Sequence, residues 1–380
     1  MAGVNCLIVN LSLHIIWLLF LSKPCSALEP KTAPSFPAIL IFGDSTVDTG
    51  NNNFIPTIFK GNYFPYGKNF PGHVATGRFS DGKLIPDMVA SKLGIKELVP
   101  SFLDPILSDD DIKTGVSFAS AGTGFDDLTA AISKVIPVMK QIDLFKNYIQ
   151  RLQRIVGVDE SRRIIGSALV VISAGTNDIN INFYDLPTRQ LQYNISGYQD
   201  FLQNRLQSLI KEIYQLGCRN IVVAGLPPVG CLPIQETIAF ENPLNRSCLE
   251  DQNSDSKAYN QKLSKLLSNL QPQLSGSTIL YADIYTPLID MVNNPQKYGF
   301  EHTTTGCCGI GLVEAGPLCN AIIPTCEDSS KFMFWDSIHP TEAAYKFIAE
   351  SLLKKLGDPL NWNLRLQLDY SSKALALENP

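Results

Sequence analysis

Five short apolar runs, rich in β-branched residues, recur along this 380-residue chain and constrain its fold more than any other feature. They are Ala38–Phe42, Val116–Ala119, Ala168–Ser173, Asn220–Ala224 and Thr278–Ala282. Short runs of this composition predict strands that are buried on both faces. Because 45% of the residues are apolar, the chain can also bury a large core around such strands.

Amphipathic helical patterns separate these runs. One pattern steps by four and three positions and ends at Gly217, a residue suited to cap a helix. Its members are Leu202, Leu206, Leu209, Ile213 and Leu216. A second pattern spans Tyr259–Leu270, and a last helix is expected near Thr341, carrying Ala344, Phe347, Ile348 and Leu352. Strands that alternate with helices predict an α/β fold: a three-layer α/β/α sandwich with a five-stranded, mainly parallel sheet.

Polar residues follow three of the predicted strands. Gly43-Asp44-Ser45 follows the first, Ala121-Gly122 lies near the second, and Gly175-Thr176-Asn177-Asp178 follows the third. Turn chemistry explains any one of these segments. Open α/β sheets bind ligands at the carboxyl ends of their strands, so three polar ends on one rim predict a pocket.

The residues at this rim and near the carboxyl terminus suit nucleophilic catalysis. Ser45 needs a base, and His339 can accept its proton. Asp336, three positions before His339, can accept the other imidazole N–H and fix the tautomer. The backbone N–H groups of Ser45 and Gly122 and the side-chain amide of Asn177 can stabilise an oxyanion. No Gly-x-Ser-x-Gly occurs in the chain, which excludes the nucleophile elbow of the α/β-hydrolases.

The amino-terminal residues 1–27 are typical of a secretory signal peptide. Leu7–Leu21 is mostly apolar, and Cys25-Ser26-Ala27 is a suitable cleavage site. A membrane anchor is the alternative, but the run is short and interrupted by polar residues. We therefore predict a secreted, extracellular protein without stable membrane insertion. No linker or charge block marks a boundary later in the chain, so residues 28–380 are predicted to form one domain.

The chain has nine cysteines, and an odd number remains once Cys6 and Cys25 leave with the signal peptide. At least one thiol is then unpaired or bonds to another chain. Four cysteines lie between positions 307 and 326, which predicts a disulfide-stapled loop in an oxidising compartment. A zinc site is the alternative, although the cluster has no Cys-x-x-Cys pair and no histidine. Asn194 and Asn245 are glycosylation acceptors in a secreted chain.

The charged residues indicate no further class of partner. The net charge is −5 and no basic cluster occurs, which argues against nucleic acid as a partner. Asp109-Asp110-Asp111 lacks the spacing of a calcium loop and is interpreted as a solvated turn. His73 and His302 lie in polar loops and are expected to be exposed, without a catalytic role. We predict no metal ion and no organic cofactor.

Four ordered segments resemble the four blocks of the SGNH hydrolase superfamily: residues 43–51, 115–124, 175–178 and 336–339. More closely, the chain is similar to the plant GDSL esterases/lipases, whose motifs are also matched by residues 77–82, 226–231 and 306–309. The resemblance covers roughly residues 36 to 356. It implies a flavodoxin-like sheet of the SGNH-hydrolase type and an ester hydrolase that needs no cofactor.

The resemblance also implies the roles of individual residues. Ser45 matches the nucleophile, Asp336 and His339 match the acid and base, and Gly122 and Asn177 match the oxyanion hole together with Ser45. Two positions depart from the family pattern. Thr46 replaces a leucine and is expected to affect packing beneath the serine. Ala121-Gly122-Thr123 replaces Gly-Gly-Ala, which leaves Gly122 and Gly124 as alternatives, with Gly122 favoured.

Other residues near these blocks receive structural interpretations. Asp44 and Asp48 are expected to organise the turn around Ser45 through local hydrogen bonds. Asp178 is expected to orient Asn177 or to cap the next helix. An aromatic group follows the serine and lines an acyl or aryl pocket or, equally, packs over the sheet. Its members are Phe54, Phe59, Tyr63, Phe64 and Tyr66.

The sequence therefore predicts a secreted serine esterase or lipase that cleaves carboxylic esters through an acyl-enzyme. An acyltransferase could use the same residues. A non-catalytic binding protein on the same scaffold is a third hypothesis, which the presence of all five site residues disfavours. The substrate is a small-molecule ester, and lipid, acetylated polysaccharide and phenolic esters all stay open.

Overall fold

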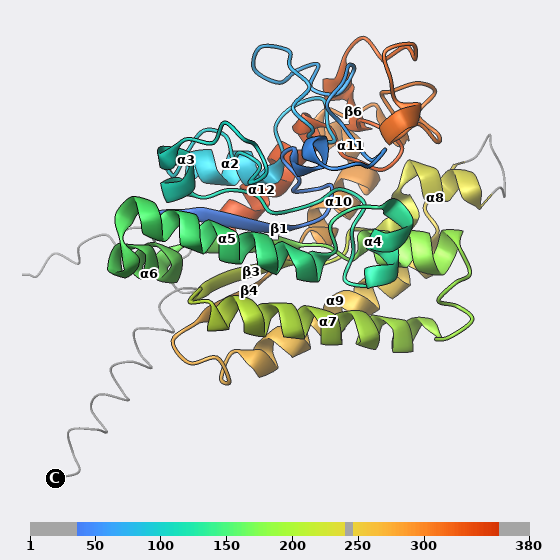
Figure 1. The fold of residues 1–380 in the computed structure, drawn as a ribbon. Coiled ribbons are helices and arrows are strands. Elements are labelled where there is room, and N and C mark those ends of the chain that lie inside the picture. Colours follow the sequence, from blue (N-terminus) through green and yellow to red (C-terminus); the bar gives the residue numbers. More distant parts are fainter. Residues whose placement is uncertain (1–35, 240–245, 357–380) are drawn as a thin grey trace, which may run out of the picture. The chain divides into compact units, whose positions relative to one another are not determined.

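A central parallel sheet organises the computed structural model, which describes residues 36–239 and 246–356 (Figure 1). Its order is β1-β2-β3-β4, with every neighbouring pair parallel. The strands are β1 (Ile39–Gly43), β2 (Leu169–Ser173), β3 (Asn220–Ala224) and β4 (Thr278–Ala282). Four of the five predicted strands are thus confirmed, and the α/β class with them.

The fifth predicted strand, Val116–Ala119, is not a regular strand. The segment does run parallel to β1: the Ile41 N–H donates to the Val116 carbonyl at 3.1 Å, and the Phe118 N–H donates to the Ile41 carbonyl at 2.8 Å. On its other side, however, the Asn51 amide takes the carbonyls of Ser117 and Ala119 at 2.9 and 2.8 Å. Backbone pairing on that side is an isolated parallel bridge between Ser117 and Ser101, so side-chain contacts and a single bridge stand where a regular strand would form a ladder. The prediction of a five-stranded sheet was wrong, and four regular strands form it.

One face of the sheet is covered by three long helices: α5 (Val138–Val156), α7 (Ile195–Gln215) and α9 (Glu250–Leu270). Alternate strand residues point into this layer, since side chains of a strand alternate between its two faces. Leu40, Phe42, Val170, Ile172 and Val223 are all at most 1% exposed. They form one cluster with helix residues such as Phe145, Leu206 and Leu263. This face is closed.

The opposite face is covered by α2 (Ile85–Lys92), α10 (Tyr285–Asn293) and α12 (Glu342–Leu356). Ile39, Ile41 and Leu169 pack there with Val89 of α2 and Leu356 of α12. The helix expected near Thr341 is α12. Because α12 starts beside the predicted base and ends against the first residues of β1 and β2, it runs antiparallel to the strands.

The remaining elements lie around this sandwich. They are α3 (Asp109–Thr114), α4 (Asp127–Ser133), α6 (Val158–Ser167), a π-helical segment (Asp178–Asp185), α8 (Pro233–Ile238) and α11 (Pro295–Tyr298). A small second sheet pairs β5 (His302–Gly306) with β6 (Phe332–Phe334) in parallel. Asp109-Asp110-Asp111, interpreted as a turn, instead form the first turn of α3, because Ser108 caps it and acidic residues stabilise a helix amino terminus.

Three disulfides form: Cys307–Cys326, Cys308–Cys319 and Cys231–Cys248. The stapled loop predicted between positions 307 and 326 is confirmed. Its four cysteines bond to one another, so they are not a zinc-ligand set. Cys218 is the free cysteine of the described residues, and burial raises the pKa of its thiol to about 12.

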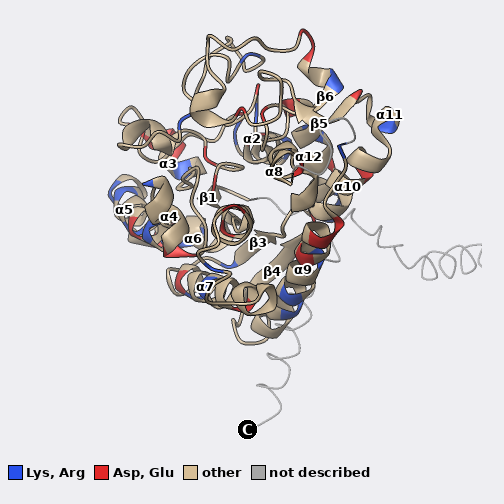
Figure 2. Cartoon of the chain, turned by 90° about the vertical axis from the view of Figure 1, so that its right-hand side faces the viewer, with Lys and Arg blue, Asp and Glu red and all other residues tan. Residues whose placement is uncertain are grey.

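Charged residues of both signs are interspersed on outer helices such as α5 and α9 (Figure 2). None of the helices in the two described ranges is both long and apolar enough for a membrane span. Within these ranges, no cluster of three or more His, Cys, Asp or Glu side chains is arranged to hold a metal ion. Asn194 is exposed and caps α7, while Asn245 and residues 1–27 lie outside the described residues.

Candidate active site

Ser45 lies directly after β1, where the chain turns sharply against β2. Gly43 has a φ of 142°, and a Cβ there would lie 1.9 Å from the Ser173 carbonyl oxygen, so only glycine fits. The buried Gln141 amide of α5 both accepts from the Gly43 N–H and donates to the Gly43 carbonyl, each at 2.9 Å. These contacts fix the end of the strand and, with it, the position of the next residues. The sequence interpretation missed Gln141.

His339 and Asp336 lie on a tight turn between β6 and α12. The turn is closed by the Trp335 N–H, which donates to the His339 carbonyl at 2.7 Å. His339 Nε2 lies 2.8 Å from Ser45 Oγ, and His339 Nδ1 lies 2.8 Å from Asp336 Oδ2. All three side chains are buried, with at most 7% exposed. The structure thus joins the two sequence blocks in one hydrogen-bonded line.

The Asp336 carboxylate is held by further donors. Its Oδ1 accepts from the backbone N–H groups of Ile338 and His339 at 2.8 and 2.7 Å. Its Oδ2 accepts from the Tyr66 hydroxyl at 2.8 Å, and that hydroxyl in turn accepts from the Gly316 N–H at 2.8 Å. Gly316 lies in the loop closed by the Cys308–Cys319 disulfide. Tyr66 therefore links the stapled loop to the carboxylate, a role that sequence did not suggest.

The predicted oxyanion donors come from three segments, and Asn177 contacts the loop that carries Gly122. Asn177 Nδ2 donates one hydrogen to the Thr123 carbonyl at 2.9 Å, which orients the amide beside the residue that follows Gly122. A side-chain amide carries two N–H donors, so its second N–H stays available. Within the described ranges, the backbone N–H groups of Ser45 and Gly122 make no hydrogen bond. Gly124 instead packs against Asp178, where a Cβ would lie 2.1 Å from a carboxylate oxygen.

Two buried aspartates fix this loop. Asp48 accepts from the N–H groups of Gly50 and Asn51, as expected for a turn, and also from the Ala121 N–H at 3.0 Å. Asp178 accepts from Phe125, Asp126 and the Thr129 hydroxyl. It therefore anchors the loop rather than the neighbouring Asn177. Burial raises the pKa of Asp48 to about 6 and that of Asp178 to about 7, although these hydrogen bonds act against the shift.

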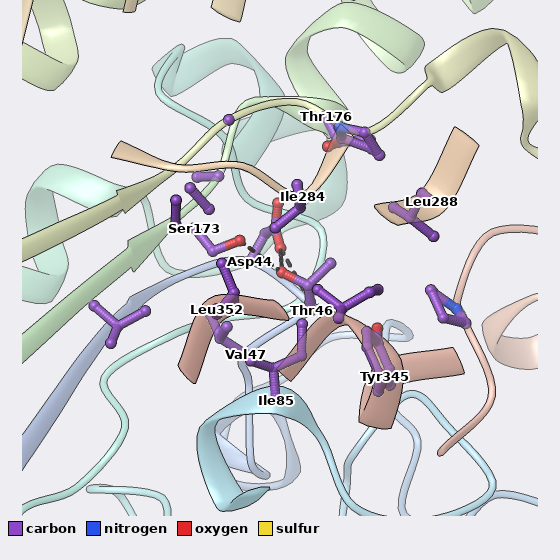
Figure 3. A pocket seen from close by; sticks show the side chains of 18 of the residues that line it. Asp44, Thr46, Val47, Ile85, Ser173, Thr176, Ile284, Leu288, Tyr345 and Leu352 are labelled. Carbon is purple, nitrogen blue, oxygen red and sulfur yellow. Dashed lines mark hydrogen bonds between the residues drawn. The ribbon is translucent and has the colours of Figure 1, made fainter. Parts of the chain in front are cut away.

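Asp44 and Thr46 flank the serine on the side of the sheet covered by α2, α10 and α12. Asp44 Oδ1 accepts from the Thr46 N–H at 3.0 Å and from its hydroxyl at 2.8 Å, and Thr46 Oγ1 lies 3.0 Å from Ser173 Oγ. Figure 3 shows these three side chains together. Burial raises the pKa of Asp44 to about 6. The local role expected for Asp44 is confirmed.

A cavity starts at these residues and extends between the sheet and the three helices (Figure 3). Ser45, Asn177 and His339 line it together with Ile85 of α2, Leu288 of α10 and Tyr345 of α12. The site thus opens into a largely apolar space.

The aromatic group that follows Ser45 does not line this cavity. Phe54 and Phe64 are exposed, Phe59 packs near Gly122, and Tyr66 is buried against Asp336. Neither interpretation fits the whole group: Phe54 and Phe64 are exposed, and Tyr66 packs with Phe79 and Trp335 in a cluster that contains no residue of the central sheet. His73 and His302 are exposed, as predicted, and neither contacts the triad. The prediction that His302 lies in a loop was wrong, since it begins β5.

The family model described as GDSL-like lipase/acylhydrolase matches residues 39–352. The chain belongs to this family. It is therefore a hydrolase of the class that acts on ester bonds, as the sequence predicts. Two Arabidopsis thaliana relatives agree. The protein named GDSL esterase/lipase At2g30310 is 58% identical over 85% of this chain and 90% of its own length, and GDSL esterase/lipase At1g06990 is 53% identical over 84% and 89%.

Solved structures are more distant. A catalytic mutant of Axe2, an acetylxylan esterase from Geobacillus stearothermophilus, is 15% identical with a TM-score of 0.39, and the match covers 86% of this chain and 96% of that one. LAE5, an α/β hydrolase enzyme from the metagenome of Lake Arreo, is 14% identical with a TM-score of 0.40 over 85% and 96%. Sequence identities and TM-scores this low do not indicate the function of this chain.

Proposed function

We propose that this protein is a serine esterase that hydrolyses carboxylic esters through an acyl-enzyme formed on Ser45. The observation that carries the proposal is the hydrogen-bonded line from Ser45 Oγ through His339 to Asp336, with distances of 2.8 Å at each step. A serine hydroxyl is a weak nucleophile until a base removes its proton, and this geometry supplies the base.

The first half of the reaction forms the acyl-enzyme. Ser45 Oγ attacks the ester carbonyl carbon, and its proton passes to His339 Nε2. The bond between the carbonyl carbon and the alcohol oxygen then breaks, and the same proton leaves with the alcohol. Asp336 accepts the Nδ1 hydrogen throughout and stabilises the imidazolium that forms. In the second half, water replaces the alcohol, its proton passes through His339, and the carboxylic acid leaves as Ser45 is restored.

The oxyanion of each half-reaction is stabilised by the N–H groups of Ser45 and Gly122 and by the second amide N–H of Asn177. Two observations support this assignment: the backbone N–H groups of Ser45 and Gly122 make no hydrogen bond among the described residues, and the loop that carries Gly122 is anchored by Asp48 and Asp178. Because such donors are fixed before the reaction starts, they lower the barrier without a reorganisation cost.

The protein acts outside the cytosol, after removal of residues 1–27. Three disulfides support an oxidising compartment, where such bonds form and persist. Sequencing the amino terminus of the protein recovered from the medium of expressing plant cells tests this part of the proposal. A retained residue 1 would contradict it.

A fluorophosphonate probe tests the nucleophile directly, since it labels activated serines. We expect the wild type to be labelled and Ser45→Ala to be unlabelled, with hydrolysis of p-nitrophenyl acetate reduced by at least about 10⁴-fold. The control is Ser91→Ala on α2, outside the cavity lining, which should behave as the wild type. Equal labelling of Ser45→Ala and the wild type would refute the assignment.

A further inference from the structure

The cavity beside Ser45 follows the length of α12. Lys355 of α12 lines it, together with four further residues of this helix: Tyr345, Ile348, Leu352 and Leu356. These four are three or four positions apart and therefore form one stripe on the helix. A rise of about 1.5 Å per residue makes this stripe about 16 Å long. Since α12 runs antiparallel to the strands, the cavity leads from the catalytic end of the sheet towards the start of the strands.

The floor of the cavity is the sheet itself. Ser173, Ala224 and Ala282, near the carboxyl ends of the strands, are small and leave space below the helices. Two positions deeper, Val171, Val222 and Leu280 lie side by side in register. Val171, Ala224 and Leu280 are only partly buried, although they lie in a parallel sheet with helices on both faces.

Polarity divides the cavity into a mouth and an interior. Polar side chains gather at the mouth, where Asp44, Ser45, Asn177 and His339 lie near the strand ends. The interior is lined by aliphatic side chains of α12 and of the sheet, and the exposed Lys355 lies at its far end. A sugar or another polar group would lose its hydrogen bonds to water in such an interior. A hydrocarbon chain would lose none.

We propose that this cavity binds the acyl chain of the ester, so that the preferred substrates are esters of straight-chain fatty acids. This inference rests on the proposed function. A C–C bond of about 1.5 Å advances an extended chain by about 1.3 Å per carbon. The cavity therefore accommodates about twelve carbons from Ser45, and longer chains reach the solvent beside Lys355.

The order of the reaction favours the acyl chain over the alcohol as the occupant. The alcohol has to take a proton from His339 and leave before water enters, whereas the acyl group stays bonded to Ser45 through both steps. A group held about 16 Å deep between sheet and helices would leave slowly. The cavity thus suits the part of the ester that remains.

Two substrate series with the wild-type protein test the proposal, at concentrations below those at which the esters form micelles. In the first, p-nitrophenyl esters carry acyl chains from acetyl to hexadecanoyl. A fully buried methylene raises kcat/KM by about fourfold, and about 1.6-fold for each of the ten methylenes between acetyl and dodecanoyl already gives about a hundredfold. We therefore expect a rise of at least about a hundredfold from acetyl to dodecanoyl and a plateau beyond it. In the second, acetate esters of ethanol, octanol and dodecanol should be hydrolysed at rates within about twofold of one another.

A matched pair of variants tests the location. Leu352→Trp on α12 fills the cavity and should lower kcat/KM for the dodecanoyl ester by about tenfold while changing that for the acetyl ester by less than about twofold. Leu353→Trp, the same change at the next residue, does not face the cavity and should leave both values unchanged. Dodecanoate, but not acetate, should inhibit acetyl ester hydrolysis by the wild type competitively.

The outcomes separate the two proposals. If neither series is hydrolysed and the probe does not label Ser45, the proposed function fails. If the acetyl ester is hydrolysed but a longer acyl chain gives no gain, the acyl-chain site is refuted while the esterase stands. A rise of kcat/KM with the length of the alcohol chain instead of the acyl chain would also refute the acyl-chain site. An equal effect of both tryptophan variants on both esters would refute it as well.

Discussion

The two faces of the sheet differ although they belong to the same strands. Towards α5, α7 and α9, strand residues such as Phe42 and Ile172 are fully buried in one continuous cluster. Towards α2, α10 and α12, Val171 and Leu280 border a cavity that reaches Ser45. The alternation of side chains along a strand allows one sheet to combine a face that is packed for stability with a face that keeps space for a ligand.

Truncation of one leucine on each side tests this difference most strongly. Leu206→Ala on α7 removes a fully buried side chain from the closed face and should lower the free energy of unfolding by about 2–5 kcal/mol. Leu352→Ala on α12 enlarges a space that already exists, so its cost should be below about 1.5 kcal/mol. Urea unfolding with the disulfides intact measures both values. Equal costs would mean that the open face is as closely packed as the other.

The buried Asp44 at the mouth of the cavity should make the free energy of unfolding depend on pH. Burial raises the pKa of Asp44 to about 6 from 3.8, so the native state holds its proton to a higher pH than the unfolded state does. The stability that this carboxyl group contributes is therefore lost as the pH rises from about 4 to about 6. Asp44→Asn removes this loss while keeping an oxygen that can accept from Thr46.

The free energy of unfolding of Asp44→Asn, relative to that of the wild type, should accordingly increase between pH 4 and pH 7, by up to about 3 kcal/mol. The comparison of one variant with the wild type at two pH values cancels the titration of groups that do not interact with Asp44. Urea unfolding at both pH values gives the two differences. A difference that does not change with pH would show that Asp44 stays charged in the native state at little cost.

The sequence predicted the strands and the site blocks because each depends on neighbouring residues. β1 to β4 are apolar runs that a parallel sheet buries on both faces, and Asp336 reaches His339 within one turn. The irregular segment Val116–Ala119 has an equally apolar run. The Asn51 amide and a single bridge to Ser101 stand there in place of a ladder, and nothing local indicates these contacts.

The cavity and the support of Asp336 depend on distant residues. The small side chains of Ser173 and Ala224 lie in predicted strands, but they leave a cavity only because of where α10 and α12 lie. Tyr66 is separated by 270 positions from the carboxylate that it contacts. From the sequence, a loop tyrosine that donates to a distant carboxylate cannot be distinguished from one that only packs, because both roles use the same buried ring.

Tyr66→Phe tests whether the hydrogen bond to Asp336 at the mouth of the cavity contributes to catalysis. The change keeps a ring that packs against Phe79 and Trp335 and removes the hydroxyl that donates to Asp336. We expect kcat to fall by about tenfold with KM within about twofold, because His339 is then less firmly oriented in the transition state. Tyr63→Phe is the matched control, since the buried Tyr63 hydroxyl has no hydrogen-bond partner in the described part of the chain. Equal kcat values for both variants would show that the Tyr66 hydroxyl does not support the Asp336 carboxylate.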